Sequence, residues 1–380
     1  MLQSDSRILT THAGSLPRPA PLADLHGRRS RGERVDPEEL RRAVGDATAA
    51  AIAAQLEAGV DIGNDGEQAR ESFFTYVQHR MTGFGGTSRR SLMRDLQEHP
   101  DFLELAVPRA ERTKVSLMRA PAAVSAVTYR DTTEMEAECD LSAGAPFAET
   151  FMTSASPGIV AAAMENRHYG SREEYVDAVA AALAEEYRYI VGRGLLLQVD
   201  APDLAMERHT LFADRPLAEF LAWVDLVVAA INRSLEGLDP SRVRLHVCWG
   251  NYEGPHTYDV GLEEILPRLY QANVGALLIS MANARHAHEY TCFRRHPLPA
   301  GMLLVAGVID TTSNYVEHEE VVADRLERIA EAVGDPHRIL AGTDCGFDTS
   351  AGIGDVAPSL VWEKLRALRA GADLATTRLL

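Results

Sequence analysis

The chain has 380 residues, of which 46% are hydrophobic and 24% are charged, a balance typical of a globular protein with a sizeable core. This composition excludes a wholly disordered or fibrous chain. The formal net charge of −17 makes the protein repel phosphate backbones and anionic lipids. We therefore expect no nucleic-acid partner and no membrane partner.

The four cysteines, Cys139, Cys248, Cys292 and Cys345, form no Cys-x-x-Cys pair. In a chain of this length they do not make a disulfide framework, so a reducing compartment is the simpler interpretation. The first residues, MLQSDSRILTTHAG, lack the apolar stretch of a signal peptide. No apolar run reaches the ~18 residues needed to span a bilayer. The sequence therefore predicts a cytoplasmic protein.

Short β-like runs alternate with long helical patterns along the chain. The expected strands, in chain order, are 8–11, 60–63, 115–118, 195–200, 243–248, 275–280, 302–310 and 338–342. The expected helices cover 38–59, 171–192, 216–236, 261–271, 318–333 and 357–370. The helix at 171 opens on a capping box, Ser171-Arg-Glu-Glu174, in which serine and glutamate satisfy free amides of the first turn.

Near-continuous apolar strands that alternate with helices are typical of a parallel sheet covered on both faces. About eight strand-like segments favour a closed (β/α)8 TIM barrel over an open doubly wound sheet. Two long irregular regions, 83–114 and 131–170, are expected to be inserted loops that cover or line a binding site. With no repeat or linker visible, residues 1–380 are expected to form one barrel domain.

The ends of the expected strands carry polar motifs, which are THAGS, NDGE, QVDAPD, HVCWGNYEGPH, SMANARHAHE, GVIDTTSN and GTDCGF. In a parallel barrel the active site lies at these carboxyl ends, so the placement predicts an enzyme. His246 and Cys248 are two residues apart on a strand, so their side chains point to the same face. Cys345 follows another strand at the same level, and one imidazole with two thiolates is a typical zinc set. The alternative is a hydrogen-bonded buried histidine with two packing cysteines.

Two carboxylates, Glu67 and Asp200, also stand at strand ends, where they suit an ammonium group or general-base chemistry. The alternative for each is helix N-capping. The segment around Gly14 and Ser15 offers backbone amides for a substrate carboxylate, or is a simple turn. Four further histidines near the expected barrel mouth, His12, His256, His286 and His288, are interpreted individually as structural or solvated.

These motifs together, extending through ANARHAHE and GVIDTTSNYVEH, resemble the cobalamin-independent methionine synthase family over almost the whole chain. The chain looks like the short members of that family, which are equivalent to the C-terminal catalytic half of the full-length enzymes. The resemblance implies a (β/α)8 barrel and zinc-activated alkylation of a thiolate. It also implies a zinc cofactor, a small-molecule thiol substrate such as homocysteine, and a methyl donor.

The resemblance assigns the zinc ligands to His246, Cys248 and Cys345. It assigns the homocysteine carboxylate to Gly14 and Ser15, and the amino group to Glu67 and Asp200. Two positions depart from the family pattern: Ser280 stands where a glutamate zinc ligand is usual, and Thr312 stands where the full-length enzymes have a catalytic histidine.

The function predicted on this basis is methyl transfer to a thiol by a zinc-dependent, methionine-synthase-like enzyme in which Glu67 and Asp200 are the catalytic carboxylates. The donor is a methylated folate, a corrinoid or a small methylated metabolite, and an oligomer is possible. Two alternatives stay open because of Ser280 and Thr312. One is a divergent thiol alkyltransferase or C–S bond enzyme of a specialised pathway, and the other is a metal-free relative that binds a small molecule.

Overall fold

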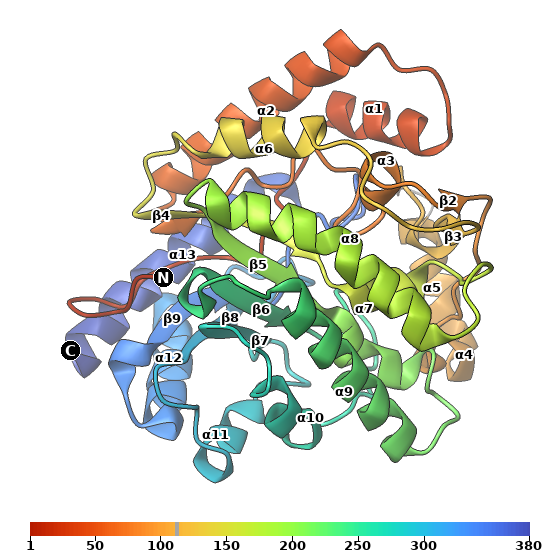
Figure 1. Ribbon diagram of the computed structural model, residues 1–380. Coiled ribbons are helices and arrows are strands. Elements are labelled where there is room, and N and C mark those ends of the chain that lie inside the picture. Colours follow the sequence, from red (N-terminus) through yellow and green to blue (C-terminus); the bar gives the residue numbers. More distant parts are fainter. Residues whose placement is uncertain (111–113) are drawn as a thin grey trace.

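The computed structural model describes residues 1–110 and 114–380. Its main feature is a parallel sheet of seven strands in the order β1-β4-β5-β6-β7-β8-β9, which curls on itself (Figure 1). These strands are β1 (Ile62–Gly63), β4 (Glu149–Ala155), β5 (Leu196–Asp200), β6 (Val243–Val247), β7 (Ala276–Ser280), β8 (Leu303–Ile309) and β9 (Ile339–Thr343). A separate antiparallel pair joins β2 (Phe84–Gly85) to β3 (Ala122–Ala123).

Helices follow most strands and pack outside the sheet, as Figure 1 shows for α8, α9, α12 and α13. The α-helices are α1 (Ala20–Ser30), α2 (Pro37–Glu57), α3 (Val77–Arg80), α4 (Arg94–Glu98), α5 (Pro100–Ala110), α6 (Thr133–Ser142), α7 (Pro157–Ala163), α8 (Arg172–Gly192), α9 (Leu217–Ser234), α10 (Leu262–Leu269), α11 (Cys292–Arg295), α12 (Glu319–Val333) and α13 (Pro358–Leu379). Short 3-10 turns are η1 (Leu117–Arg119), η2 (Pro202–Leu204), η3 (Met206–His209), η4 (Pro240–Arg242), η5 (Glu289–Thr291) and η6 (Pro336–Arg338). No helix of the described residues is long and apolar enough to cross a membrane.

The α/β class is confirmed, and the predicted barrel is matched in part. The seven-stranded ladder is open between β9 and β1. Residues 10 and 11 lie in this gap and make one parallel bridge to each edge, Thr10 to Ala341 of β9 and Thr11 to Ile62 of β1. The first expected strand, 8–11, is thus reduced to two single bridges.

Two expectations for the region before β5 were wrong. Residues 115–118 form no strand, because the Val115 carbonyl accepts a hydrogen bond from the Ser350 hydroxyl and η1 begins at Leu117. The strand in that place in the sheet is β4, which lies in a region expected to be irregular. Its sequence, ETFMTSA, is rich in hydroxyl residues, yet the strand is buried because those hydroxyls find buried acceptors. Ser154, for example, donates to Glu186 at 2.7 Å.

The inner face of the curled sheet changes from apolar to polar along the strands. Its apolar end is a buried cluster with side chains from almost every strand, including Phe151, Leu196, Leu278, Val305 and Leu340. Because strand side chains alternate between faces, the residues that follow on the same face of β5 and β6 are Gln198, Asp200, Arg244 and His246. The polar ends of the strands therefore gather at one end of the sheet, where a parallel barrel carries its active site.

Candidate active site

A cavity of about 270 Å³ lies at the carboxyl ends of the strands. Its lining includes six residues that the sequence singled out, which are Ser15, Glu67, Asp200, His246, Cys248 and Cys345. Ser15 comes from the segment after residues 10–11, and Glu67 comes from the loop after β1. Asp200 ends β5, His246 and Cys248 lie at the end of β6, and Cys345 lies in the turn after β9. Gly14 does not line this cavity. The structure thus brings the expected thiol, imidazole and carboxylate groups together.

His246, Cys248 and Cys345 form the tightest group in the cavity. All three side chains are buried, and their nearest imidazole nitrogen and sulfur atoms lie within 4.8 Å of one another. Ligands 2.3 Å from a tetrahedral zinc ion lie about 3.8 Å apart, so this spacing suits one shared ion. One imidazole and two sulfur donors are also a ligand set that binds zinc in preference to magnesium or calcium. The residues therefore fit the metal that the family resemblance implies.

The ring of His246 is fixed by a carboxylate. Its Nδ1 donates to Oδ1 of Asp200 at 2.9 Å, so in the neutral ring the lone pair is on Nε2. Desolvation lowers the pKa of His246, but hydrogen bonds to Asp200 and Cys248 outweigh burial and raise it to about 10. In the absence of another cation the ring is therefore an imidazolium at neutral pH. A carboxylate that orients a histidine in this way is common behind metal-binding imidazoles.

The two thiols are hydrogen-bonded to each other. The hydrogen bond from Cys345 to the Cys248 sulfur lowers the pKa of Cys248 well below its ordinary value and raises the pKa of Cys345. The nearby His246 ring lowers the pKa of Cys248 further. The surroundings therefore favour the thiolate form of Cys248. This arrangement has the charge and the soft donor atom that a zinc ion needs.

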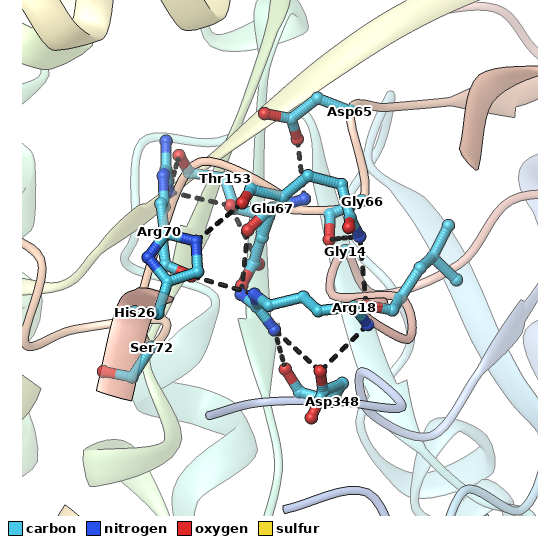
Figure 2. Close-up of polar contacts among 12 residues, drawn as sticks. Gly14, Arg18, His26, Asp65, Gly66, Glu67, Arg70, Ser72, Thr153 and Asp348 are labelled. Atoms are coloured by element: carbon cyan, nitrogen blue, oxygen red, sulfur yellow. Dashed lines mark hydrogen bonds and ion pairs between the residues drawn. The ribbon is translucent and has the colours of Figure 1, made fainter. Parts of the chain in front are cut away.

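Glu67 lines the same cavity and is held in an unusual backbone conformation. Its φ of 57° is positive, and the only other non-glycine residue with a positive φ in the described ranges 1–110 and 114–380 is His256. Such strain persists only where the surroundings hold it. Figure 2 shows those surroundings: Arg18 donates to the Glu67 carbonyl at 2.8 Å and also to Asp348, while the Glu67 amide donates to Asp65 at 2.9 Å.

The carboxylate of Glu67 has one oxygen paired and one free of hydrogen bonds. Oε1 accepts from the Thr153 hydroxyl at 3.0 Å, whereas Oε2 is buried with no hydrogen-bond partner and has only an ion pair with Arg18 at 3.9 Å (Figure 2). Burial, followed by repulsion from Asp200, raises the pKa of Glu67 to about 7 against the opposing effect of Arg70 and Arg18. A buried carboxylate oxygen without a donor is suited to bind a cationic group.

Gly14 supports this carboxylate rather than lining the cavity. Its φ is +128°, and a Cβ atom there would lie 2.8 Å from Oε1 of Glu67 and 2.6 Å from Cγ2 of Thr153. Its amide donates to Nδ1 of His12. Ser15, the next residue, is buried and does line the cavity. Of the two residues expected to contact a substrate carboxylate, only Ser15 therefore has its side chain in position.

The two departures from the family pattern lie on a second cavity of about 470 Å³, which also touches Cys345. The Ser280 hydroxyl donates to the Asp344 carbonyl at 2.7 Å. The Thr312 hydroxyl donates to Asp310 at 2.9 Å. The Asp344 carboxylate accepts hydrogen bonds from the amides of Met281 and Ala282, so this aspartate holds the loop after β7.

Several residues that shape the site were missed from the sequence. Thr153 lies on the unexpected strand β4, and Gln198 donates to Oδ1 of Asp200 at 2.7 Å while it accepts from Arg244. The remaining lining of the first cavity is mainly apolar and includes Phe73, Met93, Leu117, Met118, Met206 and Ile353. The glutamine in LLLQVD, a polar residue inside an apolar strand, was the one available signal. Met93 comes from the region 83–114 that was expected to be an inserted loop, whereas Leu117 and Met118 come from 115–118, which was expected to be a strand.

Among the four histidines expected to be structural or solvated, His12 and His288 illustrate both cases. His12 is buried, its Nε2 is paired with Gln55 at 2.8 Å, and burial lowers its pKa to about 4. His288 has a side chain that is 70% exposed. His256 and His286 both contact Asp259 and belong to a separate cluster.

Comparison with known proteins defines the class of the chain. The family model "Cobalamin-independent synthase, Catalytic domain" matches residues 8–360. The methionine synthase of Sulfolobus acidocaldarius is 24% identical over 343 residues, which cover 89% of this chain and 85% of that protein. The 2-hydroxypropyl-CoM lyase of Xanthobacter autotrophicus is 26% identical over 215 residues, covering 49% of this chain and 52% of that enzyme.

The fold is also shared with a solved structure. A B12-independent methionine synthase from Shewanella sp. W3-18-1, in complex with selenomethionine, superposes with a TM-score of 0.75 at 23% identity and 98% coverage of both chains. The fold and the family match define an enzyme of the methyltransferase class. The chain belongs to the cobalamin-independent methionine synthase family, which confirms the resemblance seen in its motifs.

Proposed function

We propose that the protein is a zinc-dependent methyltransferase that transfers a methyl group to a small thiol such as homocysteine. The observation that carries this proposal is the meeting of His246, Cys248 and Cys345 in the same cavity as Glu67 and Asp200. A soft metal-binding set beside two carboxylates matches the two ends of an amino thiol. The methionine synthases among the relatives support the same substrate class.

In this proposal His246, Cys248 and Cys345 hold the zinc ion. When bound, zinc lowers the pKa of a coordinated thiol, so that a substrate thiolate is available at neutral pH. Asp200 keeps the His246 ring oriented through Nδ1. Ser280 supplies no carboxylate, and three protein ligands leave a position for the substrate, as in catalytic zinc sites.

The carboxylate side of the cavity orients the amino end of the thiol. Glu67 and Asp200 come from different strand ends and repel one another, which the raised pKa of Glu67 reflects. An ammonium group between them relieves that repulsion and pairs with the free Oε2 of Glu67. The Ser15 hydroxyl is placed to donate to the substrate carboxylate. These contacts would fix the thiol end toward the two cysteines.

The apolar lining suits the methyl donor. Met93 of the inserted region, with Leu117 and Met118 just after it, excludes water from the reacting atoms. In the transfer the substrate sulfur attacks the methyl carbon, a C–S bond forms, and the electron pair of the broken bond leaves with the donor. A methylated folate, a corrinoid and a small methylated metabolite are the donor classes to compare.

A second candidate is a divergent thiol alkyltransferase or C–S bond enzyme. Ser280 and Thr312 favour it, because they replace the family's zinc-ligand glutamate and catalytic histidine. The partial match to a relative named as a lyase favours it too. A metal-free small-molecule-binding relative is the third possibility, and metal content separates it from the other two.

We further propose that residues 1–380 form one (β/α)8 barrel unit in which residues 9–11 act as the eighth strand. The single bridges to Ala341 and Ile62 support this proposal. The cytoplasm is the proposed compartment, supported by four cysteines that are all free and buried.

The decisive experiment measures zinc content and then methionine formation from homocysteine. The purified protein is supplied in turn with methyltetrahydrofolate, methylcobalamin and S-methylmethionine. We expect bound zinc and methionine from one of these donors. Zinc without methionine from any donor would favour the divergent enzyme, and absence of zinc from the triad would refute the proposed chemistry.

A further inference from the structure

A second cluster of histidines and carboxylates lies apart from the thiol triad. His256 and Asp259 follow β6, His286 follows β7, and His209 ends η3. Nδ1 of His256 and Nε2 of His286 each lie 2.8 Å from Oδ2 of Asp259. Nδ1 of His209 lies 2.9 Å from the other oxygen, Oδ1. Three imidazole rings therefore surround one buried carboxylate.

The hydrogen-bond partners of His256 require a positive charge, a second proton or a metal ion, beside the ring. Its Nε2 lies 3.1 Å from the Tyr252 carbonyl oxygen, which only accepts, so Nε2 must carry the hydrogen. In a neutral ring Nδ1 is then a bare lone pair, yet it faces another acceptor, Oδ2 of Asp259. The positive φ of 53° at His256 holds the ring in this place. Either a second proton or a metal ion must lie between the two acceptors.

His209 adds an independent observation. Its side chain is fully buried, and neither Nδ1 nor Nε2 has a hydrogen-bond partner. Oδ1 of Asp259 is likewise buried without a hydrogen bond, although His209 is only 2.9 Å away. The two groups are close but not aligned as donor and acceptor. Buried polar atoms without a hydrogen-bond partner are rare, and such an atom can mark the place of a bound ion.

The negative charge of the cluster also favours a bound cation. Asp95 lies 4.0 Å from His209, and Glu289 lies 3.6 Å from His286. Together with Asp259 they make three carboxylates with side chains no more than 6% exposed. Within residues 1–110 and 114–380, no lysine or arginine is paired with any of them. Asp95 accepts hydrogen bonds from the Tyr252 and Thr257 hydroxyls, and Glu289 accepts one from the Leu262 amide. These bonds bring no positive charge, so the imidazoles or a divalent cation must balance the three carboxylates.

We propose that His256, Asp259 and His286 bind a divalent transition-metal ion that is separate from the zinc of the thiol triad. The nearest ligand atoms of the three residues all lie within 4.8 Å of one another. Ligands 2.1 Å from a metal and at right angles lie about 3.0 Å apart, so the 2.8 Å separations suit neighbouring ligand positions. Two imidazoles and one carboxylate suit zinc, iron or manganese. His209 contacts the outer oxygen of Asp259 as a positioning residue.

The proposed ion has access to the active-site region. His256 and His286 line the 470 Å³ cavity that Cys345 and Ser280 also line. No residue of the cluster belongs to the thiol triad, so the two metal sites stand or fall independently. An anionic group in this cavity can therefore reach the second ion.

The test is a metal titration of the purified full-length chain stripped of metal, with Co²⁺ as the probe. Two equivalents should bind. One should give the intense sulfur-to-cobalt charge-transfer absorption of thiolate ligation, and the other only weak bands. In Cys248→Ser the strong band should disappear while one equivalent still binds. A single equivalent in the wild type, lost in Cys248→Ser, would overturn the second site without touching the proposed function.

Variants and diffraction give the second measurement. His256→Ala and His286→Ala should each lose one equivalent and keep the charge-transfer band, whereas His288→Ala, a change to an exposed histidine nearby, should bind two. If the variants fail to fold, anomalous diffraction of Co²⁺-soaked wild-type crystals decides. A peak between the His256 and His286 rings supports the site. No peak there, with a peak at the triad, shows that protons and not a metal hold the cluster together.

Discussion

The two ends of the active-site cavity are built in different ways. The thiol end, His246, Cys248 and Cys345, lies at or just after the ends of strands β6 and β9, and none of these three residues has a positive φ. The carboxylate end depends on Glu67, which lies in a loop at positive φ and is held by Arg18, Asp65 and Thr153. The sheet itself presents the proposed metal ligands, whereas a network of buried polar contacts presents the carboxylate proposed to bind the ammonium group.

This difference predicts which functions of the cavity a single substitution can separate. Asp200 is the one residue that belongs to both ends, because it faces the cavity and also accepts from His246. Changes at the thiol end should remove metal and chemistry together. Changes at Glu67 should alter recognition of the amino group and leave the metal in place.

The largest effect is expected for loss of a thiol. Cys248→Ser and Cys345→Ser should each remove most of the bound zinc and reduce methyl transfer by at least about a thousandfold, because serine is a poor zinc ligand at neutral pH. Metal analysis and a transfer assay measure both. Cys139→Ser and Cys292→Ser are matched controls, since both cysteines are buried and lie outside the triad. Full zinc occupancy in the two triad variants would contradict the assignment.

The thiol end was predictable because its signal is periodic. Residues 246 and 248 share a face of any strand, and apolar runs around 243–248 and 338–342 marked the two strands. At the carboxylate end the sequence identified Glu67 as a candidate residue but did not predict the contacts that hold it. Nothing in NDGEQ predicts that Glu67 takes a positive φ or that its partner Thr153 lies on β4. That strand was missed because its hydroxyl residues look like loop residues until Glu186 and Glu67 are in place to accept from them.

Glu67→Gln should weaken binding of an amino thiol by about ten- to a hundredfold, since a charge-assisted hydrogen bond is worth about 1.5–3 kcal/mol. The glutamine keeps the hydrogen bond from Thr153 but loses the negative charge. Calorimetry with homocysteine and with its des-amino analogue measures the effect. The analogue should bind the variant and the wild type equally. Equal losses for both ligands would mean that Glu67 is structural.

The pKa of Glu67 also predicts a pH dependence of stability. Its pKa is about 7 in the folded protein and near 4.5 when unfolded, so the folded state holds the extra proton between these values. Stability should therefore fall as pH rises from about 5 to 7, by about 2 kcal/mol from this group. Urea unfolding of metal-free protein measures this fall, and Glu67→Gln should flatten it. Glu236→Gln, at an exposed position, should keep the wild-type slope, and identical slopes in all three proteins would refute the prediction.

Asp200→Asn should affect both ends at once. It weakens the hydrogen bond that orients His246, and loss of such a supporting group commonly costs ten- to a hundredfold in metal affinity. We expect about a tenfold loss of zinc affinity in a chelator competition, with a similar loss for the amino thiol. Glu67→Gln is the internal control, because it should leave zinc affinity unchanged. If Asp200→Asn changes thiol binding alone, its contact with His246 has no part in holding the metal.

The smallest effect is expected at Ser280, where the family usually has a glutamate. Ser280→Glu brings a carboxylate next to Cys345 and removes the hydrogen bond from the serine to the Asp344 carbonyl. The lost hydrogen bond costs about 1 kcal/mol, which offsets part of the gain from a fourth ligand. We therefore expect zinc to bind only about three- to tenfold more tightly. Chelator competition at neutral pH measures the change.

Ser280→Gln makes this last prediction sharp. Glutamine has nearly the volume of glutamate and loses the same serine hydrogen bond, but it brings no negative charge. The 470 Å³ cavity beside Ser280 gives both side chains room, so a steric effect should be common to the two variants. If only the glutamate variant tightens zinc binding, the thiol end has three protein ligands and accepts a fourth. If both variants bind zinc equally, a group other than residue 280 already completes the coordination.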